Sequence, residues 1–297
     1  MSLKVVKPIT VLPSMLASSV PVDDYPEWSA VATYAADERV VHNYQVWQSL
    51  QADNTGKDPE QHATWWVLVG PVNLMRAFDR KHTTKTRFAD AAWFEIQLVD
   101  PINAFSLIEC DGIRSVTVKL EHASYGLLYE KTVGMWTVPD ESGWYAWAYG
   151  ERREQSVMHL FDLPTYRNAK LRVEIEAAND AGIGVMLLGQ QKDIGFGVMP
   201  GLSMGVRDFS RKERDQWGDV VLQERAYARE RLFRVTVEKS QLDNTDRLLT
   251  SLRATPALWL LSQKYEQANV YGWVQDWRVS VDYGPYSVLS LQIEGLI

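Results

Sequence analysis

Short segments in which apolar and polar residues alternate, separated by turn residues, recur along most of the 297-residue chain. Residues 92–99, 115–121 and 170–177 each follow this period of two. Residues 231–238 repeat it closer to the C-terminus. A period of two places apolar side chains on one face of a strand and polar side chains on the other. Because such segments follow one another with Gly, Pro, Asn and Asp between them, the sequence predicts a mainly β protein of antiparallel strands.

Changes in composition divide the chain into four predicted parts. Residues 1–24 are rich in Pro, Ser and Val without a helical period, and we expect an extended arm, either mobile or laid across a partner. Residues 25–71 are rich in aromatic residues and predict a small β-module. Residues 72–191 predict an antiparallel β-sandwich of jelly-roll type, and residues 192–297 predict a C-terminal β-rich assembly domain with one helix.

The C-terminal part contains the predicted helix. Ser240 is a suitable N-cap for a helix that runs to Arg253 and ends before Pro256. Its expected apolar stripe consists of Leu242, Leu248, Leu249 and Leu252.

Two further C-terminal segments allow more than one interpretation. Residues 273–293 predict a β-hairpin, which fits an interface with a neighbouring subunit and an internal core equally well, because alternating strands bury one face in either case. The glycines of residues 195–205 match no nucleotide-binding spacing and predict a bend or a closely packed interface.

The charge of the chain disfavours nucleic acid as a partner. Its 31 Lys and Arg face 38 Asp and Glu, and its most basic stretches, residues 76–82 and 210–215, are interrupted by acids. Binding to a phosphate backbone needs clustered cations that displace counterions. No apolar run approaches the roughly 20 residues of a membrane-spanning helix, and the N-terminus lacks the apolar core of a signal peptide. We therefore expect no membrane-spanning segment and folding in a cytoplasm.

Large aromatic rings recur at short intervals in residues 25–71. Aromatic side chains suit both sugar-stacking platforms and protein interfaces, and the chain as a whole holds 12 Trp and 13 Tyr. A domain this small cannot bury every ring completely, so some are predicted to be exposed. The rings are Trp28, Tyr34, Tyr44, Trp47, Trp65 and Trp66.

The order of these rings resembles the small chitin- and cellulose-binding modules of carbohydrate-binding families 5 and 12. The similarity is carried by Trp28, residues 34–41, residues 44–47, the loop 54–59 and Trp65. It implies a small β-fold with a ligand platform made of surface rings. The candidate platform residues are Trp47, Trp65, Trp66 and Tyr44.

The chain also departs from that pattern. Asp37 and Glu38 stand where the family usually has Gly-Asp, Asn43 replaces a common turn Gly, and Trp47 replaces a ring that is often Tyr. The alternative interpretation is that the rings defining the pattern, Trp28, Tyr34 and Trp65, form only the module's own small core.

No catalytic or metal-binding signature stands out. The visible carboxylate pairs, Asp140 with Glu141 and Glu174 with Glu176, fit a turn and the solvated face of a strand better than a glycosidase pair. The five His residues are scattered without metal-ligand spacing, and Cys110, the single Cys, is predicted to be a small buried hydrophobic residue. We predict a protein that is not an enzyme and that uses no cofactor or metal.

Residues 255–296 resemble, diffusely, the ends of bacteriophage minor tail proteins. That resemblance implies a ring- or hub-forming β-domain. We therefore predict a virion structural protein of a phage tail tip or baseplate, assembled in the host cytoplasm. Its expected partners are other tail proteins, further copies of itself in a homo-oligomer, and a cell-surface polysaccharide.

Two other functions compete with this prediction. One is a carbohydrate-binding accessory protein, or the accessory module of a polysaccharide-active enzyme. The other is an intracellular scaffold whose aromatic residues lie only in cores and interfaces.

Overall fold

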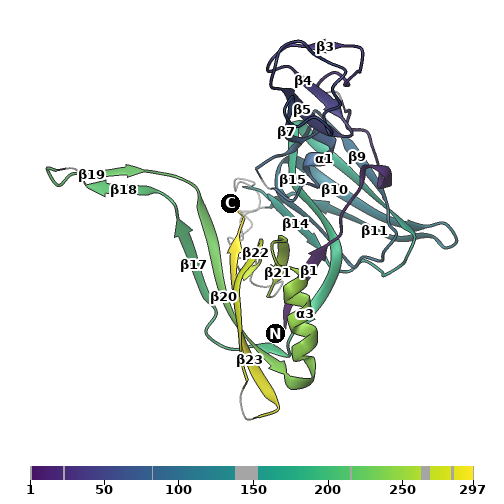
Figure 1. Cartoon of the computed structure of the whole chain (residues 1–297). Coiled ribbons are helices and arrows are strands. Elements are labelled where there is room, and N and C mark those ends of the chain that lie inside the picture. The colour runs from purple at the N-terminus through teal and green to yellow at the C-terminus, as the bar shows by residue number, and fades with distance from the viewer. Residues whose placement is uncertain are drawn as a thin grey trace, which may run out of the picture. The chain divides into compact units, whose positions relative to one another are not determined.

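The structure of the protein is a computed structural model, shown in Figure 1. Its fold is mainly β, with a large antiparallel sheet and one longer helix near the C-terminus, as the sequence predicts. The chain forms two compact units, here called unit 1 (residues 1–9, 102–104 and 188–297) and unit 2 (residues 10–101 and 105–187). The residues described are 2–22, 24–81, 83–137, 153–214, 216–261, 268–281 and 284–296.

Unit 1 is an antiparallel sheet with a helix, α3 (Leu242–Ser251), packed against its core. The fully buried side chains of this core include Leu3, Phe233, Trp259 and Leu291. The strands follow the order β15 (Ala169–Ile194), β1 (Leu3–Pro8), β21 (Ala257–Leu260), β22 (Val270–Ser280), β23 (Tyr286–Gly295) and β20 (Tyr227–Glu238), with β16 (Gly197–Val198) and β17 (Ser203–Asp208) both pairing with β20.

The predicted helix is present and its apolar stripe faces the core. Leu249 and Leu252 are buried, and Leu242 and Leu248 are partly buried against the same cluster. Its start differs from the expectation, because a 3-10 turn, η2 (Lys239–Gln241), contains Ser240 and no side chain caps α3. Burial of the stripe therefore stabilises this helix more than capping does.

The predicted hairpin of residues 273–293 lies in the interior of unit 1. Its strands β22 and β23 pair with each other, and β21 and β20 pair with their outer edges. Leu289, Leu291 and Ile293 are fully buried. β23 therefore contributes to the internal core, whereas β22 is mostly exposed from Gln275 to Ser280, so an interface on that side stays a prediction.

The N-terminal segment differs from the expected arm. Residues Leu3–Pro8 form β1, which pairs with the end of β15 on one edge and with β21 on the other. Leu3 and Val5 are fully buried. Gly189 permits this pairing, because a Cβ atom there would collide with the backbone of Lys7. Pro8 ends the strand. Because β1 pairs with a strand on each edge, it is a central strand of the sheet.

Unit 2 contains a β-sandwich-like arrangement built on two long strands, β10 (Ala104–His122) and the first part of β15. The predicted alternating segments 92–99, 115–121 and 170–177 lie on β9, β10 and β15, with their apolar faces buried. The other strands here are β2 (Leu16–Ser18), β8 (Thr86–Phe88), β9 (Ala92–Gln97), β11 (Gly126–Gly134), β12 (Trp136–Thr137), β13 (Arg153–Glu154) and β14 (Val157–Leu160), besides the short helices η1 (Pro13–Met15) and α1 (Asn73–Arg76).

The expected boundary after residue 191 lies four residues from the border between the two units, which falls after residue 187. Both positions lie inside β15, a continuous strand of 26 residues that serves both units.

The aromatic module of residues 25–71 has its own small sheets and belongs to unit 2. Tyr34, Val40 and Trp66 form its buried centre. One sheet pairs β3 (Thr33–Tyr34) with β6 (Asn54–Thr55), and the other orders β4 (Arg39–His42), β5 (Gln45–Ser49) and β7 (Trp66–Pro71).

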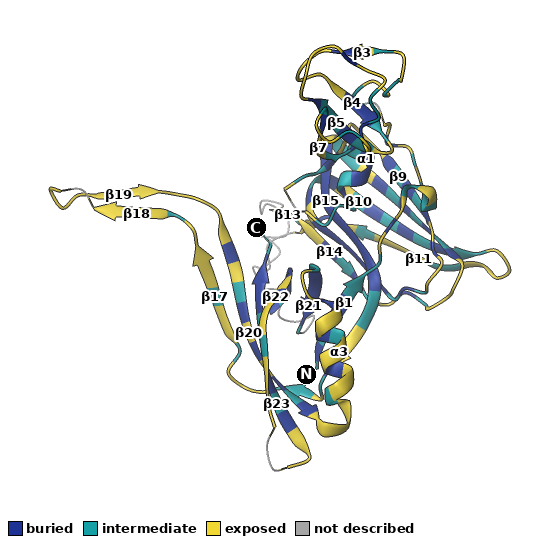
Figure 2. Ribbon diagram, viewed as in Figure 1, coloured by how far each residue is buried: buried dark blue, intermediate teal, exposed yellow. Residues whose placement is uncertain are grey.

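Unit 1 also has a feature that the sequence analysis did not predict. Two strands, β18 (Arg211–Arg214) and β19 (Val220–Gln223), form a separate antiparallel hairpin that continues the ribbon of β17 and β20. In Figure 1 this hairpin projects away from the rest of unit 1, and Figure 2 colours both of its strands as exposed. We call residues 203–232 the arm. No helix in the described part of the chain is long and apolar enough to cross a membrane.

Candidate functional site

The four candidate platform residues lie around the β4–β5 hairpin of the module, and only one of them is exposed. Tyr44 stands in the two-residue turn with Asn43, and both have positive φ angles, 59° and 50°. Such a turn matches the twist of a hairpin. The Asn43 amide donates to Glu60 Oε1 at 2.7 Å, which holds the turn against the loop that follows. The Tyr44 side chain is 41% exposed.

Trp66, predicted to be a surface ring, is in the core of the module. Its side chain is 2% exposed, its indole N–H donates to the Lys57 carbonyl at 2.8 Å, and its ring meets Tyr34 edge to face. Trp65 ends a turn and is only partly buried, whereas Trp66 begins β7 and is buried, so the two rings do not form one surface platform. Trp66 is therefore unable to stack on a sugar in this structure.

Trp65 and Trp47 are half-buried and pack against the same core. The Lys57 ammonium lies 5.7 Å from the centroid of the Trp65 ring and covers part of its surface. The indole nitrogen of Trp47 is buried and has no hydrogen-bond partner among the described residues. These contacts favour the alternative interpretation of the pattern, in which the rings mainly form the core of the module.

The Glu174 and Glu176 pair lies on the solvated side of β15, as expected. Glu174 forms an ion pair with Lys119 at 2.9 Å and accepts a hydrogen bond from Arg172 at 2.8 Å. The hydrogen bond from Lys119, followed by that from Arg172, lowers the pKa of Glu174. Glu176 accepts from the Ser115 hydroxyl at 2.8 Å. A general acid needs a raised pKa, so Glu174 is unsuited to that role.

The remaining candidate chemistry is limited. Cys110 is buried, and its burial raises the pKa of the thiol to about 12, which agrees with the predicted hydrophobic role. Among the described residues, no group of three His, Cys, Asp or Glu side chains is placed to hold a metal ion. Asp140 and Glu141 lie outside the described residues. The prediction that the protein is not an enzyme stays a prediction.

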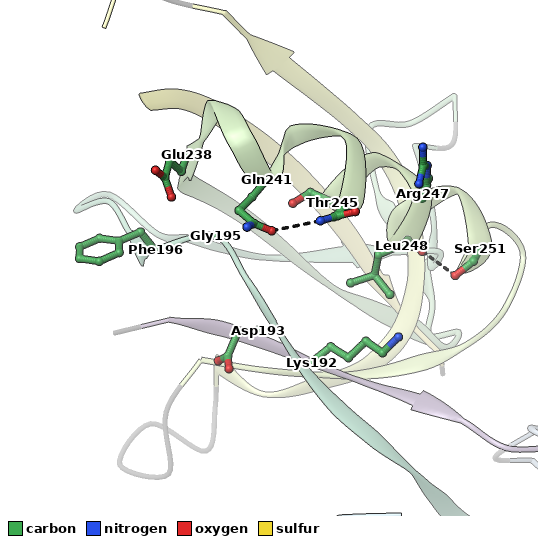
Figure 3. Close-up of a pocket in the computed structure, with 11 residues that line it drawn as sticks. Lys192, Asp193, Gly195, Phe196, Glu238, Gln241, Thr245, Arg247, Leu248 and Ser251 are labelled. Atoms are coloured by element: carbon green, nitrogen blue, oxygen red, sulfur yellow. Dashed lines mark hydrogen bonds between the residues drawn. The ribbon is translucent and has the colours of Figure 1, made fainter. Parts of the chain in front are cut away.

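A cavity of about 630 Å³ lies in unit 1 between α3 and the end of β15 (Figure 3). Lys192 and Asp193 line it from β15, and Gln241, Thr245 and Leu248 line it from η2 and α3. The lining combines apolar surface with amide and hydroxyl groups and with side chains of both charges. Its composition gives no single-sign field and therefore no preference for a charged substrate.

The arm is the surface with the clearest functional meaning. Every residue of β18 and β19 is exposed. A two-stranded hairpin without a packed face is marginally stable in water. Several exposed side chains of the arm are nevertheless large and apolar, namely Met204, Val206, Phe209, Trp217, Val220, Val221, Leu222, Tyr227 and Leu232.

Sequence reasoning did not identify the arm as a functional segment. The available signal was the run Val220, Val221 and Leu222, whose consecutive residues must point to opposite faces of a strand. A strand that is apolar on both faces is normally buried on both. The many charged residues on either side of this run contradict such burial inside the chain.

Comparisons of the chain with protein-family models, with curated proteins and with solved structures found no match.

Proposed function

We propose that this chain is a structural subunit of a protein assembly and that it associates with further copies of itself through the arm. The observation that carries this proposal is the exposure of Val220, Val221 and Leu222, between 54% and 69%, on a hairpin that pairs with no other strand of the described chain. Single exposed apolar residues are ordinary on protein surfaces, but contiguous ones on a projecting element mark an interaction site.

The free energy of burial favours a covered arm. Burying a Val or Leu side chain contributes roughly 1.5–3 kcal/mol compared with leaving it in water. The hairpin itself gains nothing from these residues while both of its faces remain in solvent. Further copies that cover both faces, one bearing Val220 and Leu222 and the other bearing Val221, would supply the packing that a two-stranded hairpin lacks.

The charged residues of the arm are partly neutralised within it. Lys212 forms an ion pair with Asp208 at 2.6 Å, and Arg211 forms one with Glu213 at 2.7 Å. A charge that already has a partner costs less to bring near an apolar surface than an isolated charge. The arm is therefore suited to a protein partner more than to a strongly charged one.

The assembly that we propose is a bacteriophage tail tip or baseplate. Three features support this proposal: the projecting arm, the mainly β architecture, and the resemblance of residues 255–296 to the ends of minor tail proteins. In such a particle, the arm would hold a neighbouring subunit.

The test is the mass of the full-length protein in solution, measured by light scattering after size-exclusion chromatography. We expect the wild-type chain to associate and Val221→Asp to be monomeric at the same concentration. The matched control is Val31→Asp, because Val31 is 89% exposed and lies in the aromatic module. A monomeric wild-type chain, or equal masses for wild type and Val221→Asp, would overturn the proposal.

A further inference from the structure

The hairpin of β10 and β11 in unit 2 ends in a cluster of three aromatic rings. The centroids of His122 and Tyr125 are 4.9 Å apart, and the Tyr166 ring lies 5.9 Å from Tyr125 and 6.1 Å from His122. Tyr125 is 69% exposed and Tyr166 is 38% exposed. Figure 2 shows the end of this hairpin as exposed. Large rings in mutual contact at the tip of a hairpin stabilise no core and need another explanation.

The ring cluster lies at the end of the β10–β11 hairpin, where the buried face of β10 ends. Val118 and Leu120 share one face of β10, and the register with β11 shifts between Leu120 and Glu121, just before His122. Val118 and Leu120 are fully buried, whereas His122 lies beyond the covered part of the sheet. The residue that pairs with His122 is Gly126, and a Cβ atom at Gly126 would meet nothing within 4 Å. There is therefore open space beside Gly126.

Polar groups lie beside Leu120, two residues before His122 in β10. Tyr129 pairs with Leu120, and its hydroxyl donates to Asp162 Oδ1 at 2.8 Å. The Lys131 ammonium contacts Asp162 Oδ2 at 2.8 Å. Partial burial raises the pKa of Asp162, but the hydrogen bonds from Lys131 and Tyr129 outweigh it, so the net pKa is lowered and the carboxylate stays ionised.

The ring cluster is formed by the β10–β11 hairpin and by the segment between β14 and β15. Asp162 and Tyr166 belong to the same segment between β14 and β15, so this segment supplies both a carboxylate and a ring. On the β10 side, His122 Nδ1 accepts the backbone N–H of Ser124 at 3.1 Å. This bond leaves the other imidazole nitrogen as the donor in the neutral ring. The segment between β14 and β15 thus carries a ring of the cluster, Tyr166, and four positions earlier the carboxylate that binds Tyr129 and Lys131.

The exposed area of the ring cluster fits a small ligand better than a protein partner. Together, Tyr125 and Tyr166 expose on the order of 200 Å² of ring surface. A standard protein interface buries about 800 Å² on each partner. The flanking residues Ser124 and Asn168 are polar and exposed, and the exposed apolar residue next to the turn is Leu127.

We propose that this cluster is a saccharide-binding site, in which Tyr125 stacks against a pyranose ring while Asp162 and Lys131 bond to its hydroxyls. A pyranose has an apolar C–H face and a polar rim, which matches rings on one side and charged hydrogen-bonding groups on the other. The Asp162 oxygens keep free lone pairs and the Lys131 ammonium keeps free N–H donors for adjacent hydroxyls. This site is distinct from the candidate platform of the aromatic module, and it does not depend on association through the arm.

The experiment applies the labelled full-length protein to an array of defined oligosaccharides of glucose, N-acetylglucosamine, galactose and rhamnose. The glycan bound most strongly is then titrated in soluble form against the wild type and the variants. We expect Tyr125→Ala to weaken the affinity by about tenfold or more, since loss of a stacked aromatic ring has an effect of this order. Asp162→Asn, which preserves shape but removes the charge, should weaken it by at least about fivefold.

The control is Tyr44→Asn, because Tyr44 is the exposed ring of the module and Asn tolerates its positive φ. It should bind as the wild type does, and so should Val221→Asp, which tests association separately. Binding that is lost in Tyr44→Asn but kept in Tyr125→Ala would assign the sugar to the module and overturn this proposal. An array without any bound glycan would overturn it as well.

Discussion

Unit 1 contains two hairpins of similar chemistry and opposite environment. The hairpin β22–β23 is flanked by strands on both edges, and Leu291 at its centre is fully buried. The hairpin β18–β19 pairs with no other strand of the described chain, and Leu222 on it is 69% exposed. Both sequences contain Val and Leu at strand spacing. The comparison shows that an apolar strand pattern predicts a strand but does not reveal whether the same chain covers it.

The different exposure of the two hairpins has a physical cause. Leu289 and Leu291 in β23 are fully buried in the core that α3 covers. The arm instead carries charged residues along β18, which would need partners inside a core. Its apolar residues therefore stay at the surface until another molecule covers them.

The largest predicted effect is in stability and separates the two hairpins. Leu291→Ala removes a fully buried side chain and should lower the free energy of unfolding by about 2–5 kcal/mol, because the lost burial adds to the cost of the cavity. Leu222→Ala should change it by less than about 0.5 kcal/mol in the monomer. Urea denaturation followed by circular dichroism measures both. Similar losses for the two variants would show that the arm packs against its own chain.

A second prediction concerns a buried side chain of unit 2, His159, and the dependence of stability on pH. Burial lowers the pKa of His159 to about 4, below its usual value of 6.5, and its Nδ1 lies 3.0 Å from the Ser106 hydroxyl. Above pH 6.5 the imidazole is neutral in both states, so stability is complete there. Between pH 6.5 and 4 the unfolded chain takes up a proton that the folded chain does not, so stability falls as the pH falls.

The size of that loss follows from the shift. A decrease of about 2.5 pKa units corresponds to up to about 3 kcal/mol once the pH is below 4. His159→Gln has no titrating ring, and its stability should lose less over the same pH range. We would measure urea unfolding of both proteins at pH 7 and pH 4.5. Parallel stability curves for the two proteins would contradict the assigned cause.

The smallest predicted effect concerns the ion pairs of the arm. Asp208→Asn removes the charge that pairs with Lys212, yet both side chains are solvated, and such pairs contribute little. The urea midpoint of the monomer should not change measurably. Association should weaken at most slightly, because the apolar residues of the arm provide most of its burial. A loss of association as complete as that of Val221→Asp would shift the proposal toward an electrostatic interface.

Most of the fold follows from local pattern, and the exceptions have physical causes. The leucine stripe predicts α3, and alternation predicts the strands of residues 92–99, 115–121 and 170–177, because burial on one face leaves a periodic signature. The strand β1 escaped prediction because its pairing partners, β15 and β21, lie far along the chain.

The candidate site was less predictable than the fold. A ring pattern identifies aromatic positions, but whether a ring such as Trp66 faces inward depends on contacts with Tyr34 and Lys57 that only the folded module provides. The cluster of His122, Tyr125 and Tyr166 joins residues more than 40 positions apart, and no local pattern connects them. Exposure on the arm could be suspected from Val220–Leu222, yet sequence gives no measure of what covers it.

The most direct test of the central claim, that another copy of the chain covers the arm, is hydrogen exchange of the amides in β18 and β19. Exchange would be followed by mass spectrometry on the full-length protein at low and high concentration. We predict slow exchange of residues 211–214 and 220–223 at the concentration where the protein associates, and fast exchange in the monomer and in Val221→Asp. Equally fast exchange of these residues in the associated protein would contradict the account.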